Sequence, residues 1–114
     1  MRAILINAET REIKEIDLAE GYMAINEALG CRCFTMIGGL PNGHDLLLDD
    51  EGLLCGPKYF YKIKGYGAPL ATCGLILAST EEGESVAASL TVEEVKSLIT
   101  FLTLAEARAM ARCE

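Results

Sequence analysis

Residues 52–80 read GLLCGPKYFYKIKGYGAPLATCGLILAST, and they join a strand pattern to a glycine turn and a second strand. Side chains alternate between the two faces of a strand, so one face here carries three lysines and a phenylalanine: Lys58, Phe60, Lys62 and Lys64. The opposite face carries Tyr59, Tyr61 and Ile63. A Gly-Tyr-Gly-Ala-Pro turn at residues 65–69 leads into an almost wholly apolar strand over Gly74–Ala78. An aromatic, positively charged strand face in an acidic protein indicates a place for an anion.

Size and composition predict a single globular domain. The chain has 114 residues, of which 51% are hydrophobic and 24% are charged. That length is sufficient to bury a core without disulfide or metal crosslinks, and the composition excludes a disordered chain. The formal net charge of −7 argues against general nucleic-acid binding, because the phosphates would be repelled.

Nothing in the sequence indicates export, a membrane span or a metal site. The N-terminal segment lacks the apolar core and cleavage site of a secretory signal, and no stretch approaches the roughly 18 apolar residues that cross a bilayer. The chain has five cysteines: Cys31, Cys33, Cys55, Cys73 and Cys113. They form no C-x-x-C pair, and His44 lies near no pair of them in the sequence. We therefore expect a cytoplasmic protein with reduced thiols, no metal, no cofactor and no membrane partner.

The N-terminal segment predicts a hairpin. Arg2–Asn7 carries apolar side chains on both faces, which is typical of a strand in the middle of a sheet. Arg11–Leu18 alternates apolar and charged residues and is expected to pair with it. Because Ile13 and Ile16 are three residues apart, we expect a bulge or bend between them.

A helix and a second hairpin follow. Ala19–Leu29 has apolar residues at helical spacing, and Gly30 is placed to cap its C-terminus. Cys31–Ile37 then predicts a strand that returns through an Asn-Gly turn at residues 42–43 into a strand over Asp45–Asp49.

The clearest helix start lies near the C-terminus. Thr91-Val-Glu-Glu94 is a capping box, and the apolar stripe that follows predicts a helix over Thr91–Leu102. A second Thr-x-x-Glu at residues 103–106 allows either one long helix or a break near Phe101.

These elements predict an α+β fold: a single compact domain with a mostly antiparallel sheet and two packed helices. We expect the domain to span residues 1–103 and an Ala-rich helical extension to span residues 104–114. Phe101, Leu104 and Met110 lie off the apolar stripe, so homo-oligomers through the C-terminal helix or through an exposed sheet edge are expected.

The candidate ligand site is the lysine strand and the turn after it. Lys58, Lys62 and Lys64 would neutralise the charge of an anion, while Phe60 and Tyr66 would stack on a base. The glycines beside Tyr66 let a ligand approach closely. The alternative is an exposed edge strand whose lysines keep it soluble and prevent pairing.

Other residues offer weaker chemistry. His44 and Asp45 are neighbours in an extended segment, so their side chains point to opposite faces, and a surface residue at a hairpin tip is the better interpretation of His44. The acidic residues Asp45, Asp49, Asp50 and Glu51 do not have the spacing of a calcium loop. We therefore predict no catalytic residue and no metal ligand.

The order of several short motifs resembles a family of small proteins of phages, plasmids and other mobile elements that is grouped as a domain of unknown function. The matching segments, within residues 1–103, are AILIN at 3–7, DDEGLL at 49–54, GY at 65–66, PLA at 69–71, GLIL at 74–77, EEG at 81–83 and TVEEVK at 91–96. The resemblance implies a mobile-element context and the cytosol of a bacterial host, and it carries no catalytic residues.

We therefore expect a non-catalytic binding protein that sequesters a small anionic ligand, such as a cyclic nucleotide immune signal, to counter host defence. The alternative is a protein-interaction module, an acidic inhibitor or DNA mimic, that occludes a host protein. A third interpretation is a small hydrolase that uses His44 or the carboxylates of Asp45–Glu51.

Overall fold

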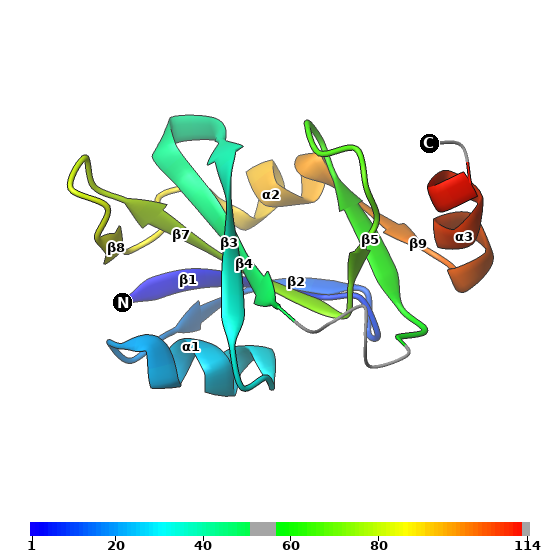
Figure 1. Ribbon diagram of the computed structural model, residues 1–114. Coiled ribbons are helices and arrows are strands. Elements are labelled where there is room, and N and C mark those ends of the chain that lie inside the picture. The colour runs from blue at the N-terminus through cyan, green and yellow to red at the C-terminus, as the bar shows by residue number, and fades with distance from the viewer. Residues whose placement is uncertain (51–56, 113–114) are drawn as a thin grey trace.

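Two antiparallel sheets and three helices form the described part of the chain (Figure 1). The structure is a computed structural model, and it describes residues 1–50 and 57–112. The predicted compact α+β domain is confirmed. None of the helices in these residues is long and apolar enough to cross a bilayer.

The larger sheet has the strand order β2-β1-β7-β4-β3, with β8 paired to β7. Its strands are β1 (Arg2–Asn7), β2 (Glu12–Asp17), β3 (Phe34–Leu40), β4 (His44–Asp49), β7 (Cys73–Ser79) and β8 (Ser85–Val86). The smaller sheet has the order β6-β5-β9, with β5 (Phe60–Ile63), β6 (Leu70–Ala71) and β9 (Ile99–Leu102). The helices are α1 (Tyr22–Leu29), α2 (Val92–Leu98) and α3 (Leu104–Arg112), with a 3-10 turn, η1 (Pro41–Gly43).

The β1–β2 hairpin confirms the predicted pairing but contains no bulge. Its register runs without interruption from Arg2 opposite Asp17 to Asn7 opposite Glu12. Ile13 belongs to the core on one face of the sheet and Ile16 to the core on the other. The three-residue spacing thus places one isoleucine on each face, because both faces of the larger sheet are covered.

Helix α1 covers one face of the larger sheet. Ile25 and Leu29 pack there with the buried side chains of β4 and β7, including Leu47 and Leu75. Gly30 ends the helix in the left-handed conformation at φ 68°, as predicted. The helix begins at Tyr22, three residues later than expected, and no side chain caps its N-terminus.

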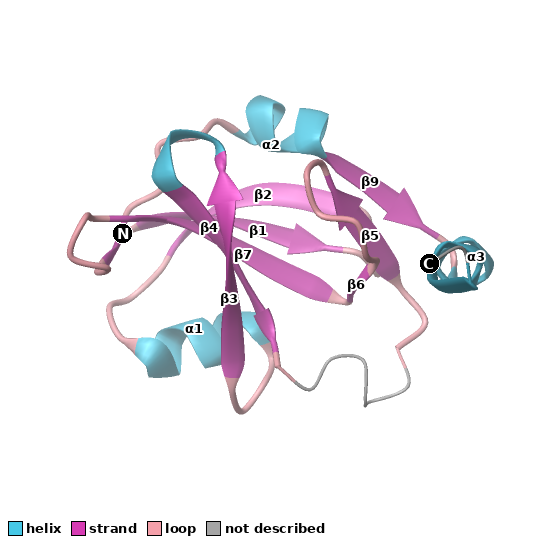
Figure 2. Ribbon diagram, turned by 45° about the horizontal axis from the view of Figure 1, so that its top comes forward, coloured by secondary structure: helices cyan, strands magenta, loops and turns pink. Residues whose placement is uncertain are grey.

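The second hairpin joins β3 to β4 through η1. Asn42 and Gly43 both have positive φ, 58° and 70°, so the predicted Asn-Gly turn is confirmed. Strand β3 starts at Phe34 rather than at residue 31 and continues to Leu40, and its register against β4 shifts between Ile37 and Leu40. Sheet order places β3 at one end of the larger sheet (Figure 2).

The smaller sheet and α2 cover the other face of the larger sheet. Tyr61, Ile63 and Ile99 of the smaller sheet share a core with buried residues of β1, β4 and β7. The α2 capping box is present: Glu94 N donates to Thr91 Oγ1 at 3.1 Å, and Thr91 N donates to Glu94 Oε1 at 3.0 Å.

The prediction of a helix over Thr91–Leu102 is wrong in its second half. Helix α2 ends at Leu98, and the next four residues form β9, which pairs antiparallel with all of β5. A second capping box follows: Thr103 N donates to Glu106 Oε1 at 3.0 Å, and Glu106 N donates to Thr103 Oγ1 at 3.1 Å. The chain therefore takes the predicted alternative, a break, because Ile99–Leu102 forms a ladder with β5 instead of continuing the helix.

Helix α3 packs on the outer face of the smaller sheet, at the opposite end of the molecule from the N-terminus (Figure 1). Ala107 is 3% exposed and shares a core cluster with Phe60, Ala71 and Leu102. Leu104 and Met110 pack against this cluster. The described part of the predicted extension thus docks on the sheet.

Candidate functional site

Strand β5 and the turn after it present two lysines to solvent beside a tyrosine. Lys62 lies opposite Thr100 in the β5–β9 ladder, and its side chain is exposed. Just beyond the strand, Lys64 N donates to Leu98 O at 2.8 Å, which fixes the chain to the end of α2. Tyr66 N donates to Ile63 O at 3.1 Å across Gly65, whose φ is 93°. Backbone hydrogen bonds therefore hold this turn in place.

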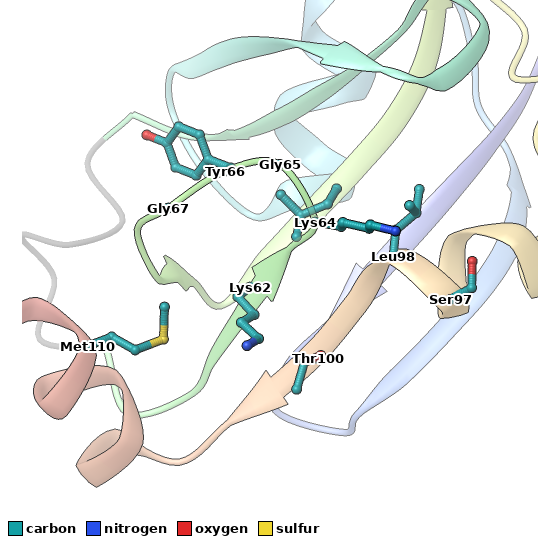
Figure 3. Close-up of a pocket in the computed structure, with 10 residues that line it drawn as sticks. Lys62, Lys64, Gly65, Tyr66, Gly67, Ser97, Leu98, Thr100 and Met110 are labelled. Atoms are coloured by element: carbon teal, nitrogen blue, oxygen red, sulfur yellow. The ribbon is translucent and has the colours of Figure 1, made fainter.

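These three residues line one hollow of about 420 Å³. Its other lining residues are Ile63, Gly65, Gly67, Ser97, Leu98, Thr100 and Met110. Figure 3 shows the Lys62 side chain directed toward Thr100 and the Lys64 side chain extended toward Leu98. The Tyr66 ring lies beyond the Gly65 turn, with its hydroxyl pointing away from both ammonium groups. The hollow thus combines two cations, two hydroxyls, an aromatic ring and apolar side chains.

The structure brings together three of the five predicted site residues. Phe60 is on the same sheet face as Lys62, but α3 covers it and leaves it only 7% exposed. Lys58 is exposed ahead of β5 and does not line the hollow. The predicted alternation is confirmed within β5, since Phe60 and Lys62 lie on one face and Tyr61 and Ile63 on the other. Alternation alone does not reveal that α3 covers the Phe60 ring.

The alternative interpretation of the lysine strand as a sheet edge applies to part of β5. The strand lies in the middle of the smaller sheet: it pairs with β9 along its whole length but with β6 only through Phe60 and Tyr61. Within the described residues Lys62 therefore has a strand partner on the β9 side alone.

Sequence reasoning missed the residues that complete the hollow. Ser97 and Thr100 lie more than thirty residues after Lys62, and Met110 lies on α3. The second Thr-x-x-Glu was a usable signal, because a helix that restarts at residue 103 leaves the preceding residues free to pair with β5.

Neighbouring side chains leave the ammonium groups of Lys62 and Lys64 available to a ligand. In the part of the chain that the structure describes, neither Lys62 nor Lys64 forms a salt bridge. Hydrogen bonds from Thr103 N and Oγ1 lower the pKa of the Glu106 carboxyl, and the charges of Arg11 and Lys62 contribute less. The Lys62 charge therefore acts on the Glu106 carboxylate, but that carboxylate accepts a hydrogen bond from Thr103 N and caps α3.

His44 is a structural residue and not the surface residue that the sequence predicted. It is 1% exposed. Its Nδ1 lies 2.9 Å from Pro41 O, and its Nε2 accepts hydrogen bonds from Ser89 N at 2.9 Å and Leu90 N at 3.3 Å. Ser89 Oγ is 3.4 Å from the same nitrogen. Because the Nε2 lone pair already accepts backbone N–H groups, the ring holds residues 89–90 against β4 and is not free to act as a base.

The acidic residues and the thiols of the described part of the chain do not form a second candidate site. In residues 1–50 and 57–112 no three His, Cys, Asp or Glu side chains come together as a metal site, and Glu51 lies outside these residues. Burial raises the pKa of the Cys31 and Cys73 thiols, with smaller contributions from nearby acidic groups, so both favour the protonated form. Cys31, Cys33 and Cys73 are free thiols; Cys55 and Cys113 lie outside the described residues.

Comparisons with protein-family models, curated proteins and solved structures find no match to this chain. The resemblance to small proteins of mobile elements therefore stays a prediction.

Proposed function

We propose that this protein is a non-catalytic binding protein for a small anionic ligand, and that the ligand is a nucleotide. The observation that carries the proposal is the joint placement of Lys62, Lys64 and Tyr66 around one hollow. All three come from β5 and the turn that follows it, and backbone hydrogen bonds set their positions before a ligand arrives.

The lining suits a phosphate attached to a flat ring. Two ammonium groups attract a phosphate, and the Thr100 hydroxyl can donate a hydrogen bond to one of its oxygens. The Ser97 hydroxyl donates to Glu94 O at 2.6 Å, so its oxygen faces the hollow only as an acceptor. The Tyr66 ring, 40% exposed, offers a stacking surface for a base. Leu98 and Met110 supply apolar contact, and a volume of about 420 Å³ lies within the common range for small-molecule sites.

The same lining supports binding rather than turnover. Among the described residues, the lining contains no histidine, carboxylate or cysteine that could transfer a proton or attack the ligand. His44, one of the residues that the hydrolase interpretation would use, is held by backbone groups of Pro41, Ser89 and Leu90.

The resemblance to mobile-element proteins gives the proposal its setting. We propose that the protein acts in the cytosol of a bacterial host and sequesters a signalling nucleotide, such as a cyclic nucleotide that activates host defence. A sequestering protein should release its ligand chemically unchanged when it is denatured, whereas a hydrolase should release product.

The test is thermal denaturation of the purified protein with a panel of cyclic and linear nucleotides and with inorganic phosphate. Ligand at a hundred times its dissociation constant should add about 2.7 kcal/mol to the free energy of unfolding, a shift of several degrees for a domain of this size. The Lys62→Ala/Lys64→Ala and Tyr66→Ala variants should lose the shift.

The chain offers close controls. Lys58→Ala removes an exposed lysine of the same segment, and Tyr59→Ala removes a tyrosine that is 43% exposed; neither residue lines the hollow. Both variants should keep the full shift. A panel that leaves the melting temperature unchanged, or a shift that the two control variants lose equally, would overturn the proposal.

A further inference from the structure

The two ends of the larger sheet differ sharply in charge. β2, at one end, carries four charged side chains in six residues: Glu12, Lys14, Glu15 and Asp17. β3, at the other end, reads FTMIGGL and has no charged residue. Within the described residues β3 pairs with β4 on one side and has no strand on the other. Charged side chains are a common means by which proteins prevent pairing at an edge strand, and β3 lacks them.

Exposed apolar side chains gather beside this edge. Met36 is 45% exposed and lies on the α1 face of the sheet, opposite the buried Leu47 in the β3–β4 register. On α1, Tyr22 and Met23 are 66% and 71% exposed. Tyr22 also lines a hollow with Phe34 of β3. Three of the five large hydrophobic residues that are exposed in the described part of the chain therefore lie on α1 and β3.

We propose that β3 is the surface through which two copies of this chain associate, by antiparallel pairing of β3 with its symmetry mate across a two-fold axis. Such an interface is self-complementary, because the same strand supplies donors and acceptors on both sides. The larger sheets of the two copies would then form one continuous sheet.

The match of β3 to itself favours a second copy as the occupant, since each copy presents the same uncharged backbone edge and the same apolar side chains. Each chain carries a formal net charge of −7, so two copies repel each other over most of their surfaces and can meet without opposing charges at this edge. Directly opposite residues in an antiparallel pair lie on the same sheet face, so the symmetric registers are centred on Thr35 or on Met36. In both registers the facing residues come from the uncharged segment around β3. In the register centred on Thr35, Phe34 faces Met36 of the second copy, and in the register centred on Met36 the two Met36 side chains face each other; both contacts lie on the α1 face.

The same features stop growth at two copies. The register of β3 shifts after Ile37, and Gly39 has a φ of 91°, so regular pairing is confined to the first half of the strand. A two-fold pair uses both β3 edges, and the ends that remain are the charged β2 strands. The assembly is therefore closed.

Light scattering after size exclusion, over a range of protein concentrations, tests this inference. The wild-type protein should reach twice the 12.3 kDa of one chain and should dissociate on dilution. Met36→Lys should remain monomeric, because it places two lysines close to the axis. Thr35→Lys, which adds a charge to the opposite sheet face, should do the same. Ala105→Lys adds the same charge at an exposed position on α3 and should still dimerise.

Hydrogen exchange gives an independent readout that does not need a variant. In the dimer the amides of Phe34–Ile37 that point away from β4 should exchange slowly, and dilution should remove that protection while β1 and β7 stay protected. A wild type that is monomeric at all concentrations would overturn the inference, and so would a dimer that both lysine variants retain. A monomeric Met36→Lys or Thr35→Lys counts as support only if its melting transition stays cooperative. No β3 residue lines the hollow around Lys62 and Lys64, but Thr35 shares a neighbouring hollow with Tyr66. The nucleotide panel is therefore repeated with Met36→Lys, which should keep the full shift, so this test and that of the proposed function fail separately.

Discussion

The hydroxyl end of the Tyr61 phenol lies against Gly74, so a side chain of the smaller sheet contacts the backbone of β7 in the larger one. Tyr61, on β5, is fully buried, and its hydroxyl donates to Cys73 O at 3.3 Å. A Cβ atom at residue 74 would overlap the Tyr61 hydroxyl, and it would lie 3.2 Å from Tyr61 Cζ and 2.9 Å from Leu46 Cδ1. Gly74 has no positive φ, so it is needed for space and not for its backbone conformation.

Gly74→Ala should therefore destabilise the protein by about 1–3 kcal/mol, the usual cost of overpacking a core. In the Gly74→Ala/Tyr61→Phe double variant the overlapping hydroxyl is absent, so the second substitution should recover part of the loss. Urea denaturation of the two single variants and the double variant measures the coupling free energy. Strictly additive losses would show that the hydroxyl is not what fills the space over Gly74.

Tyr61 also makes the free energy of unfolding depend on pH in the alkaline range. Burial, with a smaller contribution from Cys73, raises the pKa of Tyr61 well above the ordinary tyrosine range. The folded state thus favours the neutral phenol. This contribution to stability is fully present below about pH 10, where the phenol of the unfolded chain is also neutral, and it is lost as the pH rises toward the folded pKa.

Denaturation midpoints measured across alkaline pH should fall more steeply for wild type than for Tyr61→Phe. The difference in phenolate absorbance between the two proteins should appear only when the wild type unfolds. Phenolate from Tyr61 in the still-folded protein would contradict the burial of this ring.

His44→Ala should cost about 3 kcal/mol of stability. It leaves a cavity in a buried site and removes the hydrogen-bond partner of Pro41 O, Ser89 N and Leu90 N. Ser89→Ala should change stability by less than about 0.5 kcal/mol, because the Ser89 side chain is exposed and its backbone N–H remains. Thermal denaturation of both variants tests the structural role of His44. Unchanged melting temperatures in both variants would contradict that role and would instead suit a catalytic Ser–His pair.

The α3 capping box predicts a local effect at acid pH. The hydrogen bonds from Thr103 lower the pKa of Glu106, so the charged carboxylate is favoured in the folded state. The stabilising contribution is present above about pH 4.3, the ordinary glutamate value, and is lost as the pH falls through the lowered folded pKa. Hydrogen exchange of α3 amides should accelerate over that window.

Thr103→Ala should increase exchange in α3 already at neutral pH and reduce the effect of acid. Thr91→Ala removes the matching cap of α2 and serves as the control, because it should loosen α2 by about 1 kcal/mol without changing α3. Equal responses of both helices to either substitution would contradict two separate capping boxes.

Local signals in the sequence were reliable wherever a few neighbouring residues decide the conformation. The Asn42-Gly43 turn, the left-handed Gly30 and the Thr91 capping box were all identified from residue type and spacing, and each depends on φ preferences or on hydrogen bonds between residues at most a few positions apart. The β1–β2 hairpin was also predicted, but the bulge expected within it is absent.

Lys62, Lys64 and Tyr66 of the candidate site could be predicted in the same way. The alternation of Lys62 with its neighbours and the glycines around Tyr66 placed both residues at the surface correctly. The hydroxyls of Ser97 and Thr100 could not be assigned to this site, because that requires knowing that β9 pairs with β5.

By itself, then, the sequence determined the turns, the caps and the α+β class, since these follow from short-range hydrogen bonds, backbone preferences and apolar spacing. Only the tertiary structure decided that Ile99–Leu102 is a strand, that Phe60 lies under α3 and that His44 is buried against residues 89–90. In each case the deciding partner lies thirty or more residues away, and its burial and hydrogen bonds outweigh the preference of the local segment.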